Sequence, residues 1–459
     1  MSLFDAVFAY IAASKAYSGA FLIAIATFTL LVLKNLKHAG EKGEATKQTT
    51  VLVPPTNDSK DRVSGEWSPT KFSYPEFPPC LEDLSEIKPI PYRPFRWGDY
   101  HVTMGIRSMH WADWIELDCQ FAHYHRIKAH RIHTRGEGVV RVLQETPGLV
   151  RSGAEAAIEL VHELAEYLSR RYPTTYKITR HNTLQGSTEF GWNDAPPVKT
   201  VTLVPLSVSY ELPLDITDTN ALRAMEISSL LVQDDLALMI EGSDGRYYFQ
   251  AGGICVPGFW RIQDKIGLPL DEIHFSGNVP QYKEKLHTSL ERFFRRLPVD
   301  KPVIRNNYFV QTIRLSRDNE APDEVKQIDP EELAWSTTTN GPEDAFEHGH
   351  GTYSAVPAKP TPDALRLRTE RQTLRRLPRS GAIVFTIRTY LTPVEALGKE
   401  RGIPGRLASA LRSWPDDVAD YKGKKRYFDV LVNYMDQCHE EQVKNGVVGP
   451  DEKLGQYPF

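Results

Sequence analysis

The spacing of apolar residues predicts several amphipathic helices. Residues 153–171 and 281–297 carry apolar side chains at intervals of three and four, which is the spacing of one helix face. Less regular stretches of the same kind predict further helices at 108–133, 258–267, 404–413 and 422–444. We expect these helices to wrap around a core that other elements provide.

Between these helices the pattern changes to short apolar runs that are typical of strands. Residues 235–241 and 247–256 flank the turn sequence Gly-Ser-Asp-Gly and predict two strands joined by a hairpin. Two more strands are predicted at 303–315 and 382–391. The combination predicts an α+β class, with an antiparallel sheet wrapped by helices.

The N-terminal region is more apolar than a soluble protein requires. Ala16–Leu33 contains no charged residue, and a helix of this length covers about 27 Å, close to the hydrocarbon core of a bilayer. Lysines follow this segment, beginning with Lys34 and Lys37, and predict that the rest of the chain lies in the cytosol. We therefore expect an N-terminal transmembrane helix and single-pass membrane localisation, in the endoplasmic reticulum. A cleaved signal peptide and a soluble amphipathic segment are the alternatives.

Changes in composition along the chain predict its domain organisation. The polar stretch after the apolar segment is typical of a flexible tether, and an acidic, proline-rich stretch interrupts the main domain as a surface insertion that we expect to be partly disordered. The predicted parts are a membrane anchor at 1–37, the tether at 38–70, the main domain at 71–445 with its insertion at 317–363, and a C-terminal tail at 446–459.

Composition excludes several classes of protein. The 459 residues are 41% hydrophobic and 25% charged, which is typical of a globular protein, and the formal net charge of −4 argues against nucleic acid as a partner. The four cysteines form no CxxC pair, which argues against a disulfide scaffold, a cysteine-rich zinc site and an iron–sulfur cluster. The sequence also contains neither a P-loop nor a GxGxxG element, so any redox chemistry needs electrons from elsewhere.

Histidines offer candidate metal ligands, with signals of different strength. Five of them fall within 108–133 without an HxxxH pair, and a solvated basic helix face explains them as well as a metal site does. His348 and His350 lie in the predicted insertion. His274 stands where a short predicted helix meets a proline-containing loop, a position where a neutral imidazole can bind iron. A buried histidine without a ligand is the alternative interpretation.

Arginines are dense between residues 366 and 390, which suggests binding of a carboxylate or phosphate. Strand alternation puts Arg388 and Tyr390 on one face and Ile383, Phe385 and Ile387 on the other. A face that carries Arg and Tyr suits a pocket wall, although a half-exposed strand with a solvated polar face has the same pattern.

Four segments together resemble the family of haem-dependent oxidative N-demethylases, in its haem-binding α-subunit type. They are MGIRSMHWADWIELD, AGGICVPGFWRIQDKIGLPL, GLPLDEIHFSGNVPQY and RTERQTLRRLPRSGAIVFTIRTY, within about residues 100–440. The resemblance implies a PAS-like fold that holds one haem b. It also implies O₂-dependent oxidation of a small amine with release of formaldehyde, and a separate reductase as electron donor.

Carried onto this sequence, the resemblance implies roles for individual residues. His274 is the expected iron ligand. Arg371 and Arg388 are expected to serve haem propionates or pocket electrostatics, and Tyr390 and Arg388 to act in catalysis. Asn307 is expected to contact the cofactor; it falls in a segment that reads Arg-x-Asn-Trp in the family, and Tyr308 replaces its tryptophan here.

Three functions remain open from the sequence. The first is a haem-dependent oxidoreductase of the monooxygenase or oxidase type that acts on an amine or related small molecule. The second is a PAS-like haem sensor, or a haem-binding protein without turnover, at a membrane. The third is a structural membrane protein that has lost haem. Amine-dependent O₂ consumption separates the first from the second, and the absorption of bound haem separates both from the third.

Overall fold

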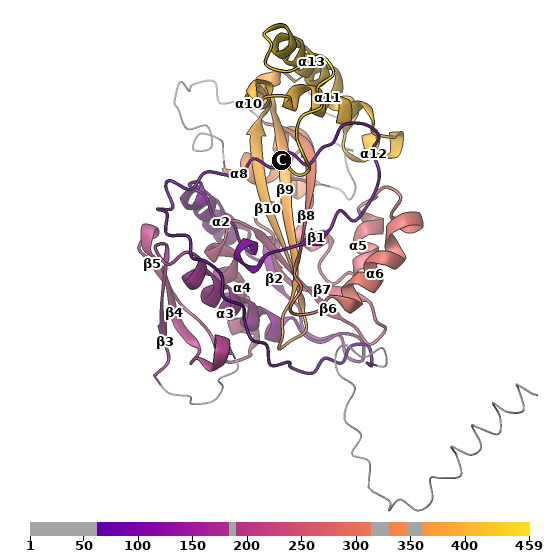
Figure 1. The fold of residues 1–459 in the computed structure, drawn as a ribbon. Helices are drawn as coiled ribbons and strands as arrows, with labels where there is room; N and C mark the ends of the chain where they lie inside the picture. The colour runs from indigo at the N-terminus through magenta and orange to yellow at the C-terminus, as the bar shows by residue number, and fades with distance from the viewer. Residues whose placement is uncertain (1–61, 183–189, 314–329, 347–359) are drawn as a thin grey trace, which may run out of the picture. The chain divides into compact units, whose positions relative to one another are not determined.

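Seven strands form the main sheet of the protein, in the order β1-β8-β9-β10-β6-β7-β2 (Figure 1). The computed structural model describes residues 62–182, 190–313, 330–346 and 360–459, and all of them belong to the compact unit Thr56–Phe459. All neighbouring strands of this sheet are antiparallel. The strands are β1 (Arg107–Ser108), β2 (Val140–Val142), β6 (Asp235–Glu241), β7 (Tyr247–Gly253), β8 (Val303–Thr312), β9 (Leu365–Arg376) and β10 (Ile383–Pro393).

A second sheet and a set of helices complete the described part of the chain. The second sheet is antiparallel and contains β3 (Tyr176–Arg180), β4 (Val198–Leu203) and β5 (Val208–Glu211). The helices are α2 (Phe121–Arg135), α3 (Ala154–Arg171), α4 (Asp218–Leu231), α5 (Leu270–Ser276), α6 (His287–Arg296), α8 (Pro330–Trp335), α9 (Thr337–Asn340), α10 (Val394–Lys399), α11 (Ile403–Arg412), α12 (Asp416–Tyr421) and α13 (Phe428–Lys444).

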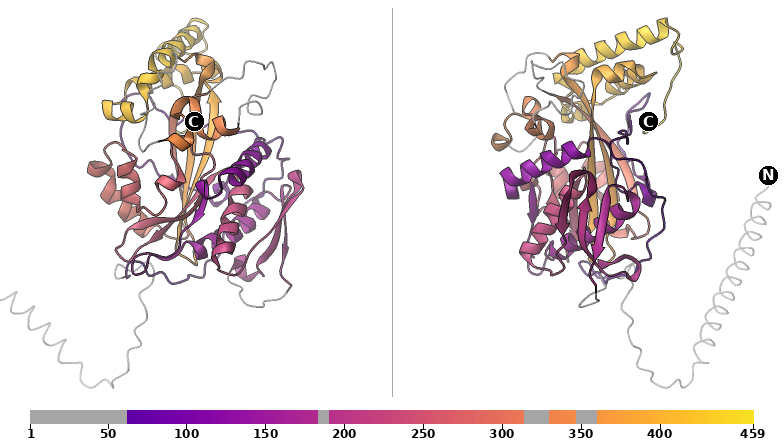
Figure 2. Two further views of the ribbon diagram at one scale, coloured as in Figure 1. Left: turned by 180° about the vertical axis from the view of Figure 1, so that it is seen from behind. Right: turned by 90° about the vertical axis from the view of Figure 1, so that its left-hand side faces the viewer.

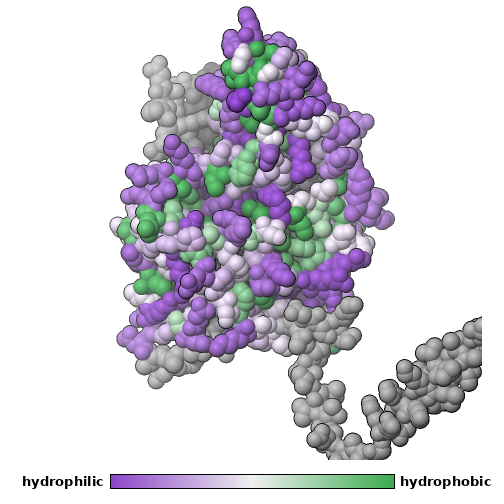
Figure 3. Space-filling view, in the orientation of Figure 1, coloured by the Kyte–Doolittle hydropathy of each residue, from purple (hydrophilic) through white to green (hydrophobic). Residues whose placement is uncertain are grey.

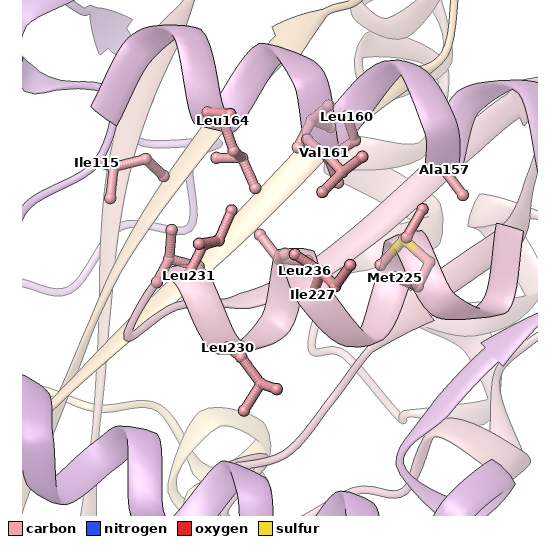
Figure 4. Close-up of a cluster of buried hydrophobic side chains, with 14 of the residues drawn as sticks. Ile115, Ala157, Leu160, Val161, Leu164, Met225, Ile227, Leu230, Leu231 and Leu236 are labelled. Carbon is pink, nitrogen blue, oxygen red and sulfur yellow. The ribbon is translucent and has the colours of Figure 1, made fainter. Parts of the chain in front are cut away.

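The main sheet is covered on both faces. On one face Leu236 and Val384 join a large hydrophobic cluster with α3 and α4 (Figure 4). On the other face Leu374 packs with Leu270 of α5 and Phe294 of α6. Figures 1 and 2 show α5 and α6 on the side of the sheet away from α3 and α4. We call these two sides the α3 face and the α5 face.

Most elements follow the predicted pattern. The helix predicted at 153–171 is α3, and the hairpin of β6 and β7 and strands β8 and β10 lie where they were predicted. In α3 the stripe that includes Val161 and Leu164 points at Leu231 of α4 (Figure 4). These side chains are fully buried, which explains why their periodicity was a strong signal.

Three local predictions were wrong. The segment 108–133 contains a 3₁₀ turn, Trp111–Asp113, before α2 begins, and 258–267 contains only the 3₁₀ turn Ile262–Asp264. Gly258 has a φ of +79°, and a Cβ there would lie 2.5 Å from Cζ of Arg368. A helix cannot contain such a residue, so the chain crosses the sheet as a loop. Strand β9 was not predicted, because its dense arginines were interpreted as a segment that binds a carboxylate or phosphate.

The prediction of an N-terminal transmembrane helix needs correction. The segment 16–33 lies outside the described residues, and no helix within the described ranges is long and apolar enough to cross a membrane. The observed fold class is α+β with a large antiparallel sheet, and the structure does not support the transmembrane part of that prediction or the single-pass membrane localisation. On the surface shown in Figure 3, hydrophobic residues lie in small groups among hydrophilic ones.

Segments at the edges of the predicted main domain contact its core. Arg62 forms a buried ion pair with Glu241 of β6. At the other end of the chain, Arg406 NH1 donates to the carbonyl of Phe459 over 2.7 Å. Trp335, inside the predicted insertion, is fully buried, and its Nε1 donates to Gly341 O over 2.9 Å. Residues 317–329 and 347–359 of the insertion, with His348 and His350, lie outside the described residues, and the predicted domain boundaries stay a prediction.

Replacement of Leu164 by alanine tests the packing of α3 on α4. The side chain is fully buried, so its loss removes apolar contacts and leaves a cavity. We expect a loss of about 2–5 kcal/mol in the free energy of unfolding, measured by urea denaturation. The control is Leu81→Ala, because Leu81 is 68% exposed and its truncation should leave stability nearly unchanged. Equal stabilities of the two variants would contradict this packing.

Candidate functional site

Three of the predicted site residues lie together on the α3 face of the sheet. Arg371 of β9 and Arg388 of β10 are direct partners in the register of the two strands, and Tyr390 is two residues further along β10. All three side chains are buried. The predicted alternation, which put Arg388 and Tyr390 on one face, therefore agrees with the strand geometry.

Each of these side chains has a partner from the segment before α2. The Arg371 Nε lies 2.9 Å from Glu116 Oε1, and the Tyr390 hydroxyl donates to Glu116 Oε2 over 2.8 Å. Arg388 NH2 donates to Asp118 Oδ2 over 2.6 Å. Burial alone would lower the pKa of Arg388, but the charge of Asp118 outweighs it, and the pKa is raised. Two guanidinium groups thus each face a carboxylate in this buried cluster.

The predicted iron ligand, His274, lies on α5 and therefore on the opposite face of the sheet. Its Nδ1 lies 2.6 Å from Leu270 O, and its ring stacks on Tyr282 with centroids 4.6 Å apart. Burial lowers the pKa of His274 to about 4, so the imidazole is neutral at pH 7. A carbonyl accepts only from N–H, so Nδ1 carries the proton and Nε2 keeps its lone pair.

Asn307 belongs to the α5 face as well, because it pairs with Glu370, one residue out of phase with Arg371. Its Oδ1 accepts a hydrogen bond from Nζ of Lys422, over 3.3 Å. The preceding Asn306 lies on the α3 face, where its Oδ1 accepts from Arg107 over 2.8 Å. The structure thus separates the predicted site residues, with His274 and Asn307 on the α5 face and Arg371, Arg388 and Tyr390 on the α3 face.

A polar row on the α5 face escaped the sequence predictions. Arg305 of β8 is the register partner of Gln372, and Asn307 that of Glu370. Glu370 accepts from Arg368 Nε over 3.1 Å and from Gln372 Nε2 over 3.0 Å. The alternation of β9 holds this signal, because Arg368, Glu370 and Gln372 are two residues apart, but it is visible only once β9 is known to be a strand.

The same row continues to a buried lysine. Lys422, which follows α12, donates to Tyr308 O over 2.6 Å, and its Nζ lies 4.5 Å from the Tyr308 ring centroid and 5.2 Å from that of Trp414. Burial lowers its pKa to about 7 despite the nearby carboxylate of Glu370. A partly neutral amine therefore binds β8 beyond the two residues that pair with β1.

One group on the α5 side has the composition of a metal site. Asp271, His287 and Glu291 place one ligand atom each within 4.8 Å of one another. Asp271 already has a partner, because Nη2 of Arg246 donates to both of its carboxylate oxygens over 2.7 Å. His274 is not part of this group. Within the part of the chain that the structure describes, the five histidines of 108–133 form no such group either.

Comparison with known families identifies the chain. Residues 105–432 match the family described as "Haem-dependent oxidative N-demethylase, alpha subunit-like". The chain belongs to this family. The matched residues include strands β6 to β10 and helices α5 and α6, and therefore both faces described above. The family name refers to haem, to oxidative removal of an N-methyl group and to an α subunit, so it suggests a small-molecule substrate.

The chemistry of the α5 face fits haem better than that of the α3 face. Iron takes a neutral imidazole with a free lone pair, and His274 has this form. The haem carboxylates favour cationic partners, and Arg305 on the same face has a solvent-shielded Nε and forms no ion pair within the described residues. On the α3 face Glu116 and Asp118 already neutralise the arginines.

Replacement of Arg388 by methionine separates a structural role from a catalytic one. The change leaves Asp118 buried without its cation, and we expect a loss of about 3–5 kcal/mol in the free energy of unfolding. Hemin affinity per folded molecule should stay that of the wild type, because the pair lies on the face away from His274. Urea denaturation and hemin titration measure the two effects, with exposed Arg292→Met as the control. Unchanged stability with lost hemin binding would restore the predicted haem role.

Replacement of Lys422 by methionine should change how stability depends on pH. The pKa of Lys422 is about 7 in the folded chain and near 10.5 when exposed, so the unfolded chain binds more protons between these values. The stability of the wild type should therefore rise from pH 7 to about pH 10, relative to the variant. Urea denaturation at pH 7, 8.5 and 9.5 measures this difference. Parallel profiles would show that the amine is solvated.

Proposed function

We propose that the protein is a haem-dependent oxidoreductase whose haem b would be held on the α5 face, with His274 as the residue that would bind its iron. The observation that carries the proposal is the state of His274, whose Nδ1–H is held by Leu270 O while Nε2 keeps its lone pair. Second contacts of this kind orient an imidazole toward a metal. The family match supports the cofactor and the type of reaction.

The proposed reaction is O₂-dependent demethylation of an amine. One oxygen atom of O₂ is inserted into a C–H bond of the N-methyl group, and this carbon leaves as formaldehyde when its bond to nitrogen breaks. The other oxygen atom leaves as water. Two electrons and two protons balance the reaction, and the nitrogen keeps a proton in place of the methyl group. When bound, haem supplies the redox centre for this oxidation. A separate reductase supplies the electrons in this proposal.

The chain contributes binding, orientation and a desolvated setting. The π-stacked Tyr282 holds the imidazole plane of His274, and the cluster around Leu270, Phe294 and Leu374 excludes water from the floor of this face. Asn307 and Gln372 present polar groups on the same face, where they can orient a polar substrate. Such fixed side chains cost no reorganisation during the reaction.

Replacement of His274 by alanine tests the ligand assignment. We expect hemin affinity to fall at least about tenfold, because a coordination bond is lost, and the histidine-ligated absorption spectrum to disappear. Added imidazole should restore that spectrum in the variant. Hemin titration of the full chain, followed by absorption, measures both effects.

The matched control is His287→Ala, because His287 also lies beside Tyr282, with ring centroids 5.7 Å apart. This variant should keep the affinity and spectrum of the wild type. A His274 variant with wild-type spectrum and affinity would refute the ligand assignment. A full-length wild-type chain that binds no hemin would refute the proposed function itself. If hemin binds but amines never stimulate O₂ consumption with an added reductase, a haem sensor is the better interpretation.

A further inference from the structure

Buried arginines in the centre of the protein have anionic or carbonyl partners, whereas one half-buried arginine on the α5 face is an exception. On the α3 face Arg371, Arg375 and Arg388 are paired with Glu116, Glu163 and Asp118, and on the α5 face Arg368 is paired with Glu370. Arg376 donates to backbone carbonyls, including Gly381 O over 2.7 Å.

The exception is Arg305. Within the described residues it forms no ion pair, and its Nε is shielded from solvent without a hydrogen-bond partner. Burial lowers its pKa, which means that the charge is held at a cost in this position. A guanidinium group remains charged under all ordinary conditions, so the cost is not removed by deprotonation.

The neighbouring groups cannot neutralise Arg305. Glu370 acts on its charge from a distance, but both oxygens of Glu370 already accept hydrogen bonds from Arg368 and Gln372. Tyr100 and Tyr421 also act on Arg305, and burial raises the pKa of both phenols, so they are uncharged at neutral pH. The site therefore has a fixed positive charge that forms no ion pair among the described residues, and its acidic neighbour Glu370 is already engaged by two other side chains.

The position of Arg305 connects it with the proposed iron ligand. It lies on the α5 face as the register partner of Gln372, whose Oε1 is also buried without a partner. Burial is the main cause of the lowered pKa of His274, and the positive charge of Arg305 lowers this pKa further. An anion bound to Arg305 would thus lie on the same side of the sheet as His274.

We infer that Arg305 is a ligand-binding residue that takes an organic carboxylate. The planar guanidinium matches a carboxylate in two parallel hydrogen bonds, and the buried setting strengthens this contact. The inference rests on the proposed function, because that function supplies two sources of the carboxylate. One source is a propionate of haem, and the other is an N-methylated amino acid as the substrate.

The experiment compares Arg305→Gln with the wild-type full chain. Without ligand, the variant should fold with equal or greater stability, because a half-buried charge that forms no ion pair is removed. A merely structural arginine would give the opposite result. Arg292→Gln, which changes an exposed arginine of α6, is the matched control, and Arg305→Lys tests whether the fork geometry is needed.

Two ligand series distinguish the sources of the carboxylate. The first compares the affinity for hemin with that for hemin dimethyl ester, in which both propionates are blocked. The second compares thermal stabilisation by N,N-dimethylglycine with that by dimethylamine. If a propionate is the partner, Arg305→Gln should weaken hemin roughly 10- to 100-fold and leave the ester unchanged. If the substrate is the partner, the variant should lose stabilisation by N,N-dimethylglycine and bind hemin like the wild type.

The inference is overturned if Arg305→Gln matches the wild type in both series, or if the variant is less stable without ligand and unchanged in ligand binding. These results are separable from a failure of the proposed function. If the wild-type chain binds no hemin, N,N-dimethylglycine still tests Arg305 on the haem-free protein, through the loss of its stabilisation in the variant and its retention in Arg292→Gln.

Discussion

A buried guanidinium group is costly unless an anion or a set of carbonyls faces it, and strand β9 carries five arginines through the centre of the sheet. This constraint explains why distant segments converge on β9. Glu116 precedes α2 and Glu163 lies in the middle of α3, and each neutralises one arginine of the strand. The packing of the α3 face therefore depends on ion pairs as well as on its hydrophobic cluster.

The same constraint divides the protein into a structural face and a ligand face. On the α3 face the charges of Arg371 and Arg388 are balanced within the chain. On the α5 face Arg305 forms no ion pair among the described residues, and His274 has the tautomer of a metal ligand. The proposed function and the proposed carboxylate contact both follow from this asymmetry. Both assign ligand binding to the α5 face.

The sequence predicted the individual elements better than their relative positions. The hairpin of β6 and β7 and the helix α3 carried clear periodicity, because each buries apolar side chains in a regular pattern. Strand β9 was missed because both of its faces are buried and its charged residues interrupt the apolar pattern of a strand, so its arginines suggested binding of an external anion instead of pairing within the chain. The separation of His274 from Arg388 could not be predicted. It depends on the face of the sheet against which α5, the helix after β7, packs. Adjacent residues such as Asn306 and Asn307 then fall on opposite faces.

The central claim is that iron binds on the α5 side of the sheet, and the position of iron in hemin-loaded crystals of the full chain tests it most directly. Anomalous scattering at the iron absorption edge locates the metal independently of any assumption about its ligand. The account predicts a single strong peak at coordination distance from Nε2 of His274. A peak on the α3 face, beside Arg371, Arg388 and Tyr390, would contradict it.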